Sequence, residues 1–205
     1  MHFHKVALLG VGLLGGSIGL ALRQRKLATR IEGYVRREAS VAECERLGVV
    51  ERATNDLLAV VKGSDLIILC TPVGQMRPLL ENCLPALKPG ALITDVGSVK
   101  GQLVAELEPL ALQVGAHFVG SHPMAGAEQT GPAAARANLF EGAVCVVTPS
   151  AKSPSSAVRR IEEFWDGLGG RTLRLTPDQH DSLVARSSHL PHVVAAELAN
   201  YVLSP

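Results

Sequence analysis

His122 is the residue whose type and surroundings point most directly to chemistry. It lies between Ser121 and Pro123, in a glycine-bearing segment that follows the apolar stretch 117–119. A neutral imidazole with a pKa near neutrality can accept the proton of a hydroxyl group while a hydride leaves the same carbon. The alternative is a histidine that only satisfies carbonyl groups of a loop, and the residue type alone leaves both interpretations open.

Four other polar side chains are candidates for a binding site. Ser98 can cap the N-terminus of a helix and still bind a ligand. Lys100 falls in the first turn of that expected helix, where the helix dipole disfavours a cation, so we expect an anionic neighbour and rank Lys100 as a substrate-binding candidate. His189 and His192 share a helix face, but no HExxH pattern supports a metal site. Two donors lining an anionic pocket and two ordinary helix histidines both remain open.

A glycine-rich loop near the N-terminus indicates a dinucleotide site. Gly10, Gly12 and Gly15 follow an apolar run and open an expected helix, with Leu13 and Leu14 between them. The first glycine allows a tight turn, the second lets a pyrophosphate approach the backbone, and the third lets helix and strand pack closely. Phosphate then binds the unpaired amide groups at the helix N-terminus. A purely structural glycine turn is the alternative.

The residues after the second expected strand discriminate between nicotinamide cofactors. About 20 residues beyond the last glycine, NAD-binding sheets place an acidic residue that holds the ribose 2′-hydroxyl. Here Val35 takes that position and is followed by Arg36 and Arg37, with Ser40 behind them. Two guanidinium groups can bind a 2′-phosphate, so we predict NADP rather than NAD and leave NAD use open. Two solvated surface arginines are the alternative.

The elements that must position these side chains alternate between strands and helices. Continuous apolar runs of strand length, such as 66–70 and 91–94, are typical of a parallel sheet covered on both faces. Ligands bind at the carboxyl ends of such strands, so Thr71 and Pro72 join the predicted cofactor site. We expect an α/β fold with a doubly wound, mainly parallel sheet. The expected strands are 6–9, 31–35, 66–70, 91–94, 117–119, 143–147 and 172–175, and the expected helices are 13–27, one from about 41 capped by Ser40, 75–86, 99–113 and 155–168.

The pattern changes at Thr176, where Thr176, Pro177 and Asp178 form a helix-start signal. The rest is expected to be helical and bent near Pro191, because proline removes a backbone donor. Its apolar residues have only the preceding domain to pack against. We therefore expect a nucleotide-binding domain over 1–175 and the start of a second, helical domain over 176–205. A helix that closes the first domain is the alternative.

Composition excludes several classes of protein. The 205 residues are 47% hydrophobic and 19% charged, which is incompatible with a disordered chain. A formal net charge of +1 and 3% aromatic residues argue against nucleic-acid partners and a membrane surface. We find no signal-peptide cleavage site and no apolar run long enough for a membrane span. Four scattered cysteines without CxxC spacing predict reduced thiols in a cytoplasmic protein, with neither disulfide nor metal site.

Three strings in a fixed order resemble a known family. TDVGSVK at 94–100, SHPMAG at 121–126 and SHLPH at 188–192, behind the glycine loop, are similar to those of the prephenate/arogenate (cyclohexadienyl) dehydrogenases of tyrosine biosynthesis. The resemblance covers essentially the whole chain, and the last two strings are far more specific than the glycine loop. It implies a Rossmann-type domain followed by an all-helical dimerisation domain. It also implies NAD(P)-dependent oxidative decarboxylation of prephenate, arogenate or both, without a metal.

The resemblance also implies roles for individual residues. His122 matches the family histidine that hydrogen-bonds the substrate hydroxyl and accepts its proton, and Ser98 matches a serine that bonds the same hydroxyl near the nicotinamide. His189 and His192 match histidines that line the substrate pocket, and Glu128 matches an acidic residue at its mouth. Oxidation at the 4-hydroxyl, followed by loss of carbon dioxide, makes the ring aromatic.

One departure from the family pattern concerns the end of the chain. The family's helical domain carries an arginine that binds a substrate carboxylate, and Arg186 does not match its motif. We expect this chain alone to bind cofactor but to turn over slowly, and the full-length protein to form a homodimer. Two alternatives to the family are another short NADP-linked reductase acting on imines or hydroxyacids, and a non-catalytic NADP-sensing module.

Overall fold

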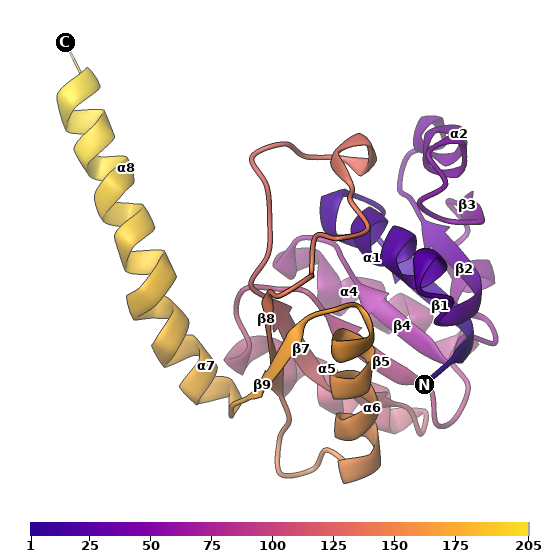
Figure 1. The fold of residues 1–205 in the computed structure, drawn as a ribbon. Coiled ribbons are helices and arrows are strands. Elements are labelled where there is room, and N and C mark those ends of the chain that lie inside the picture. The colour runs from indigo at the N-terminus through magenta and orange to yellow at the C-terminus, as the bar shows by residue number, and fades with distance from the viewer. Residues whose placement is uncertain (205) are drawn as a thin grey trace.

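The computed structural model describes residues 1–204, which form a six-stranded parallel sheet flanked by helices (Figure 1). The strand order is β3-β2-β1-β4-β5-β6, and each strand runs parallel to its neighbours. The central strands are buried on both faces, as a doubly wound sheet requires. The fold class predicted from the sequence is therefore confirmed. The strands of this sheet are β1 (Phe3–Leu9), β2 (Ala28–Tyr34), β3 (Arg52–Thr54), β4 (Leu66–Leu69), β5 (Leu92–Asp95) and β6 (His117–Phe118).

Two apolar cores cover the two faces of this sheet. Alternate residues of β1 point to opposite faces, so Leu8 joins one core and Leu9 the other. The first core packs α1 and α6 against the sheet, and the second packs α3, α4 and α5. The helices are α1 (Leu13–Gln24), α2 (Ala39–Arg46), α3 (Leu57–Val61), α4 (Val73–Cys83), α5 (Gly101–Gln113) and α6 (Ser155–Gly167), with short 3-10 turns at Leu84–Ala86 and Pro132–Ala134.

A second, three-stranded sheet follows the first. The sequence pattern predicted a single sheet and did not distinguish these three strands from the others. It comprises β7 (Gly120–Pro123), β8 (Val144–Thr148) and β9 (Arg171–Arg174), with β7 antiparallel and β9 parallel to β8. Gly120 permits this pairing, because a Cβ there would lie 2.6 Å from the Thr148 hydroxyl oxygen. His122, expected in a loop, therefore lies in a strand paired with Val146.

Two short elements were not predicted from the sequence, and one predicted helix cap was wrong. Strand β3 and helix α3 were not predicted, because elements of three and five residues are too short to show a period. Ser40 does not cap α2: the helix begins at Ala39 after Glu38, and no side chain caps it. The turn before α2 already has helical backbone angles at Glu38, so the cap position moves upstream of Ser40.

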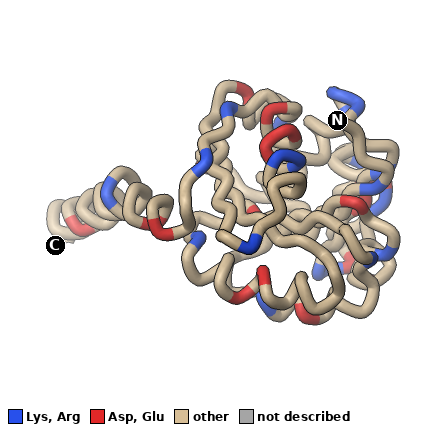
Figure 2. The backbone as a smooth tube through the Cα atoms, turned by 90° about the horizontal axis from the view of Figure 1, so that it is seen from below, with Lys and Arg blue, Asp and Glu red and all other residues tan. Residues whose placement is uncertain are grey.

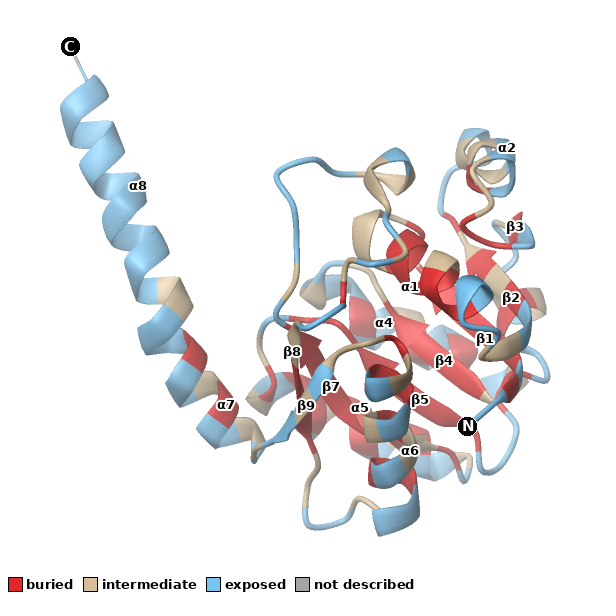
Figure 3. Ribbon diagram, in the orientation of Figure 1, coloured by how far each residue is buried: buried red, intermediate tan, exposed pale blue. Residues whose placement is uncertain are grey.

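The C-terminal segment extends away from the sheet domain, as Figures 1 and 2 show from two directions. Helix α7 (Pro177–Val184) begins with the predicted signal, in which Thr176 and Gln179 form a reciprocal capping box. A π-helical turn over Ala185–His189 replaces the expected bend at Pro191, and α8 (Leu190–Leu203) follows it. Helix α8 is exposed along its whole length (Figure 3). Within residues 1–204, none of the helices is both long and apolar enough to cross a membrane.

Candidate functional site

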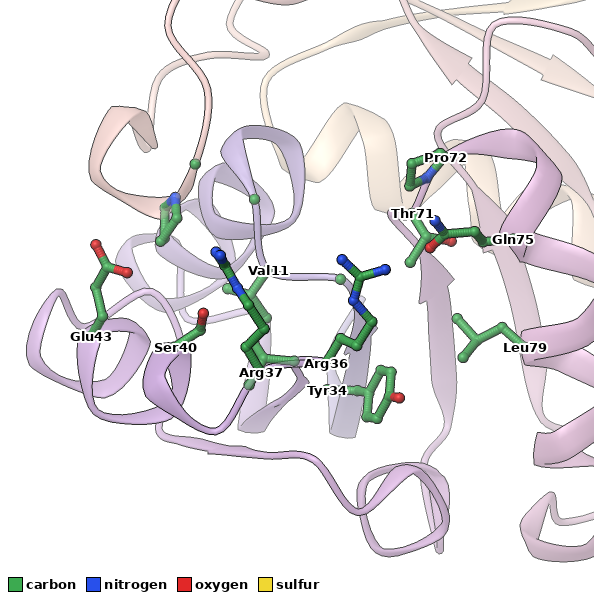
Figure 4. A pocket seen from close by; sticks show the side chains of 15 residues that line it. Val11, Tyr34, Arg36, Arg37, Ser40, Glu43, Thr71, Pro72, Gln75 and Leu79 are labelled. Carbon is green, nitrogen blue, oxygen red and sulfur yellow. The ribbon is translucent and has the colours of Figure 1, made fainter.

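A cavity of about 490 Å3 lies where the carboxyl ends of β1, β2 and β4 meet (Figure 4). Strands β1 and β4 are neighbours, yet the chain builds outward from them in opposite directions, so a crevice opens between their following loops. Most of the predicted cofactor-binding residues line this cavity: Gly10, Gly12, Arg36, Arg37, Ser40, Thr71 and Pro72. The remaining four, Leu13, Leu14, Gly15 and Ser98, do not line it.

The glycine loop at the floor of the cavity is built for close approach of a ligand to backbone. Gly10 has a positive φ of +103°, which L side chains rarely adopt, and it makes the turn out of β1. A Cβ on Gly15 would lie 2.1 Å from the Gly10 carbonyl oxygen, so Gly15 acts by packing. A Cβ on Gly12 would meet nothing within 4 Å, because it faces open space. No side chain caps α1, which leaves its first amide groups available to an anion.

The wall of the cavity supplies polar partners that a dinucleotide needs. The hydroxyl of Thr71 is buried and has no hydrogen-bond partner within residues 1–204, as expected of a group that awaits a ligand. The side chains of Arg36 and Arg37 rise into the cavity from the end of β2 (Figure 4), and both are exposed. Neither forms an ion pair within the described chain, whereas Glu43 contributes a single carboxylate to the same lining. The residues present therefore fit a dinucleotide.

A second polar cluster joins β7 to α7. Nδ1 of His122 lies 2.9 Å from Nε2 of His180, and Nδ1 of His180 lies 2.7 Å from a carboxylate oxygen of Asp181. The two imidazole rings meet edge to face, with centroids 5.1 Å apart. Asp181 also accepts the backbone N–H groups of Lys100 at 2.7 Å and Gly101 at 2.8 Å. Helix α7 is thereby fastened to the start of α5 directly above His122.

The electrostatics of this cluster keep its histidines neutral. Burial lowers the pKa of His122 to about 3, and the nearby charges of Lys100, His180 and His189 act in the same direction. Burial also lowers the pKa of His180, although its hydrogen bond to Asp181 opposes the shift. The expectation of a His122 pKa near neutrality is thus corrected for the unliganded protein, because desolvation penalises the imidazolium.

Lys100, predicted to bind substrate, is enclosed in the protein and has partners there. Its ammonium group is fully buried, paired with the Asp95 carboxylate, and donates to the Ser121 carbonyl at 2.8 Å. Asp95 further accepts the N–H groups of Gly97 at 2.8 Å and Ser121 at 3.0 Å. The anionic neighbour expected of a lysine at a helix N-terminus is therefore Asp95. The pair connects β5, α5 and β7, so it holds the two sheets together below His122.

None of the other predicted substrate residues forms a hydrogen bond with His122 within residues 1–204. Ser98 is exposed just after β5, and His189 is half-buried in the π-helical turn, near enough to His122 to lower its pKa. His192 and Glu128 are exposed. Residues 1–204 contain no group of three or more His, Cys, Asp or Glu side chains that could hold a metal ion, and all four cysteines are free.

Sequence analysis missed His180 and Asp181. The signal was present in the helix-start motif, which fixes the helical phase of α7. His180 and Val184 are four residues apart and are the buried residues of α7, so a helical period counted from Pro177 would have placed His180 on the inner face. A histidine at a buried, amphipathic helix position is a candidate for a polar contact.

Comparisons with known proteins agree on one family. A sequence profile described as "Prephenate dehydrogenase, nucleotide-binding domain" matches residues 18–174. The chain is 34% identical over 201 residues to a cyclohexadienyl dehydrogenase of Zymomonas mobilis, covering 98% of this chain and 68% of that protein. It is 35% identical over 196 residues to a prephenate dehydrogenase of Bacillus subtilis, covering 95% of this chain but only 53% of that protein.

A solved structure extends this similarity to the fold. The crystal structure of prephenate dehydrogenase from A. aeolicus in complex with hydroxyphenyl propionate and NAD+ matches with a TM-score of 0.91 at 32% identity. The match covers 98% of this chain and 70% of that one. The chain thus spans about two thirds of the length of two of these relatives and about half of the third.

Proposed function

This chain belongs to the prephenate dehydrogenase family, and from that premise we propose that it oxidises prephenate, arogenate or both, with loss of carbon dioxide, in tyrosine biosynthesis. A hydride passes from the hydroxyl-bearing ring carbon to the oxidised nicotinamide, and the hydroxyl proton passes to the protein. The ring carboxylate then leaves as carbon dioxide, and the phenolate oxygen takes a proton back. Family membership leaves the alternative of an imine or hydroxyacid reductase without support.

The observation that carries the proposal is the neutral, buried imidazole of His122. Only 9% of its surface is exposed, its Nδ1 is engaged by His180, and Nε2 makes no hydrogen bond within residues 1–204. Strand β7 contacts β5, whose carboxyl end lies at the same edge of the sheet as the glycine loop. We propose that a substrate bound beside β5 and β7 presents its hydroxyl to Nε2 of His122.

A negatively charged substrate would also raise the low pKa of His122, which otherwise makes this residue a weak base. In the protein alone, burial and neighbouring cations lower its pKa. A bound dicarboxylate places negative charge near the ring and favours the imidazolium, so the pKa of His122 rises when substrate binds. Proton transfer is therefore coupled to the presence of the anionic substrate. Ser98, His189, His192 and Glu128 are proposed to complete that substrate pocket.

The experiment replaces His122 by Asn in the enzyme and follows the absorbance of reduced nicotinamide with prephenate and with arogenate. We expect kcat to fall by about 10²- to 10⁴-fold, the contribution of a general base, while nucleotide binding stays intact. His2→Asn makes the same chemical change at an exposed position far from the site and serves as the control. Unchanged turnover by His122→Asn, or no turnover of either substrate by the wild type, contradicts the proposal.

We further propose that NADP is the preferred cofactor. Val35 is buried and occupies the position of the usual acidic residue, so no carboxylate there repels a 2′-phosphate. Arg36 and Arg37 line the cavity beside Ser40, and their two positive charges outweigh the one carboxylate of Glu43. Guanidinium groups bind phosphate with paired hydrogen bonds, which a ribose hydroxyl cannot match.

The test of cofactor preference is a calorimetric titration of the double variant Arg36→Ala/Arg37→Ala with NADP and with NAD. We expect the Kd for NADP to rise by about 10- to 100-fold through the loss of charge-assisted contacts to the 2′-phosphate, and the Kd for NAD to change little. Glu43→Gln is the matched control, and it should leave NADP binding equal or tighter. Equal wild-type affinity for the two cofactors, or an unchanged Kd for NADP in the variant, contradicts the preference.

We propose that residues 1–175 form the nucleotide-binding domain and that 176–205, of which the structure describes 176–204, open a helical domain that pairs two protomers. Helix α8 supports this assignment, because its apolar residues are exposed, Val202 and Leu203 at 68% and 80%. Light scattering should find a dimer for the complete protein. Val194→Asp together with Leu198→Asp, in the middle of α8, should shift it to monomer; an unchanged mass would contradict the interface.

We also propose a cytoplasmic location, which the state of the cysteines supports. All four cysteines are free, and three of them are buried. Unpaired thiols of this kind persist in a reducing compartment, so we place the reaction in the cytoplasm.

A further inference from the structure

Three ionisable side chains form a continuous hydrogen-bonded line from the surface of α7 to β7. Asp181 is partly exposed, His180 is fully buried, and His122 ends the line in the second sheet. The links measure 2.7 Å from Asp181 to His180 and 2.9 Å from His180 to His122. His180 uses Nδ1 for Asp181 and Nε2 for His122, so the positions of the protons along the line depend on the group at its end.

Asp181 sets the donor-to-acceptor direction of these hydrogen bonds, because its carboxylate can only accept a hydrogen bond. Burial alone would raise its pKa, but hydrogen bonds from Gly101, His180 and Lys100 together lower it. The carboxylate is therefore ionised at neutral pH and has no proton to donate. It follows that Nδ1 of His180 carries a hydrogen and donates to Asp181.

The remaining protons follow from the neutrality of both rings. A neutral imidazole that is protonated on Nδ1 has a lone pair on Nε2. Nε2 of His180 must therefore accept, and Nδ1 of His122 must donate to it. His122 is then left with its lone pair on Nε2, the nitrogen without a partner within residues 1–204.

We propose that Asp181 and His180 are positioning residues that hold His122 in its Nδ1–H tautomer, with Nε2 as the proton acceptor. The use made of that acceptor rests on the proposed function, whereas the tautomer itself does not. When the substrate hydroxyl gives its proton to Nε2, the new imidazolium donates from Nδ1 toward His180, and the Asp181 carboxylate lies at the far end to stabilise the charge. A ring that flipped or changed tautomer would present N–H to the hydroxyl and could not accept its proton.

Two further charged or titratable groups face His122 and must be considered. Lys100 lies at the N-terminus of α5 and opposes protonation, although Asp95 neutralises most of its charge. His189 approaches from the π-helical turn and also opposes protonation when charged. Neither donates or accepts a hydrogen bond with His122, so neither fixes the tautomer. That role falls to His180, whose own tautomer is set by Asp181.

The test is nitrogen NMR of the histidine-labelled protein at neutral pH, which reports protonated and unprotonated ring nitrogens separately. We expect Nδ1 of His122 to carry the hydrogen in the wild type. His180→Phe fills the same space without an acceptor, so His122 should shift largely to the Nε2–H tautomer. His180→Gln is the matched variant, because its amide oxygen can accept from His122 while its nitrogen donates to Asp181. It should retain the wild-type tautomer.

Kinetics on the same variants give a second readout. His180→Phe should lower kcat by about 10²- to 10⁴-fold with KM within a few-fold, and His180→Gln should recover activity to within about 10-fold of wild type. A wild-type His122 with Nε2–H, or a tautomer unchanged in His180→Phe, overturns the proposal. If His180→Phe fails to fold, His180→Gln still decides, since loss of the Nδ1–H tautomer in that variant contradicts the acceptor role. An Nδ1–H tautomer in an enzyme that turns over neither substrate would reject the proposed function and leave the tautomer assignment intact.

Discussion

The cofactor cavity and the histidine cluster lie at the same edge of the protein but are built on opposite principles. The cavity is made of backbone, glycines and exposed arginines, and no side chain caps helix α1, so the first amide groups of that helix are available to an anion. The cluster is made of buried ionisable side chains that satisfy one another, with Lys100 and His180 fully enclosed. The first site is open to solvent and can bind an anionic ligand. The second site is a buried network whose charged groups are already paired within the protein.

This contrast teaches where each site is sensitive. A backbone site tolerates side-chain changes that leave its space open, and it fails when a new atom fills that space. A buried polar network fails when a single partner is removed, because the remaining charge keeps its desolvation cost without its compensation. Stability should therefore depend on the cluster much more steeply than on the arginines of the cavity.

Lys100→Met should produce the greatest loss of stability. It leaves the Asp95 carboxylate buried without its cation, and removing one partner of such a pair costs about 3–5 kcal/mol. Denaturant unfolding measures the change, with Lys152→Met at an exposed position as the control. Adding Asp95→Asn should restore part of the loss by removing the stranded charge. A stable Lys100→Met protein with a selectively raised substrate KM would instead return Lys100 to the role of substrate ligand.

Variants at two residues of the glycine loop should separate its role in packing from its role in dinucleotide binding. Gly15→Ala places a Cβ 2.1 Å from the Gly10 carbonyl oxygen, and the clash should cost about 1–3 kcal/mol because both atoms belong to the backbone turn. Gly12→Ala meets nothing within 4 Å in the protein alone, so its stability should stay close to wild type while dinucleotide binding weakens. Thermal unfolding and nucleotide titration of the two variants test this. Equal destabilisation by both would mean that Gly12 also serves packing.

Acid should destabilise the protein through the cluster. The folded-state pKa of His122 is about 3, below the unfolded value of about 6.5, so the unfolded chain binds more protons between these pH values. Above a pH of about 6.5, His122 does not reduce the free energy of unfolding. As the solution is acidified from there toward a pH of about 3, this free energy falls by about 1.4 kcal/mol per pH unit. The lowered pKa of His180 acts in the same direction.

Unfolding free energies at several pH values between about 7 and about 4.5 check this. His122→Gln should show a shallower decline than wild type, and His2→Gln should match the wild type because His2 is exposed. Parallel declines in His122→Gln and wild type would contradict the neutral, buried state of His122.

The same contrast explains what the sequence could and could not predict. Gly10, Gly12 and Gly15 act within one turn of chain, and Arg36 follows the next strand, so local pattern and topology rules sufficed to place them. His122 and His180 are 58 residues apart, and their contact depends on how α7 docks on a second sheet. No periodicity of either segment encodes that docking.

Lys100 shows the limit of local reasoning in another way. Its position at a helix N-terminus correctly predicted an anionic partner, but that partner could equally be a substrate or a residue of the protein. The choice depends on β5 ending in Asp95 directly beneath the start of α5, which is a property of the folded sheet. A cation at a helix N-terminus therefore indicates that an anionic partner is present, and the tertiary structure determines which group that partner is.

Salt should produce the smallest effect and should act on the cavity alone. Arg36 and Arg37 are exposed, and raising the ionic strength from about 0.1 M to about 1 M shortens the screening length from about 10 Å to about 3 Å. The Kd for NADP should therefore rise by about 3- to 10-fold more than the Kd for NAD, since only NADP carries the 2′-phosphate. Titrations of both cofactors across that range measure the difference. The acid-dependent loss of stability should keep its slope, because its groups are shielded from ions by burial. If NAD weakens as much as NADP, salt acts on the pyrophosphate that both share, and the arginines contribute no discrimination.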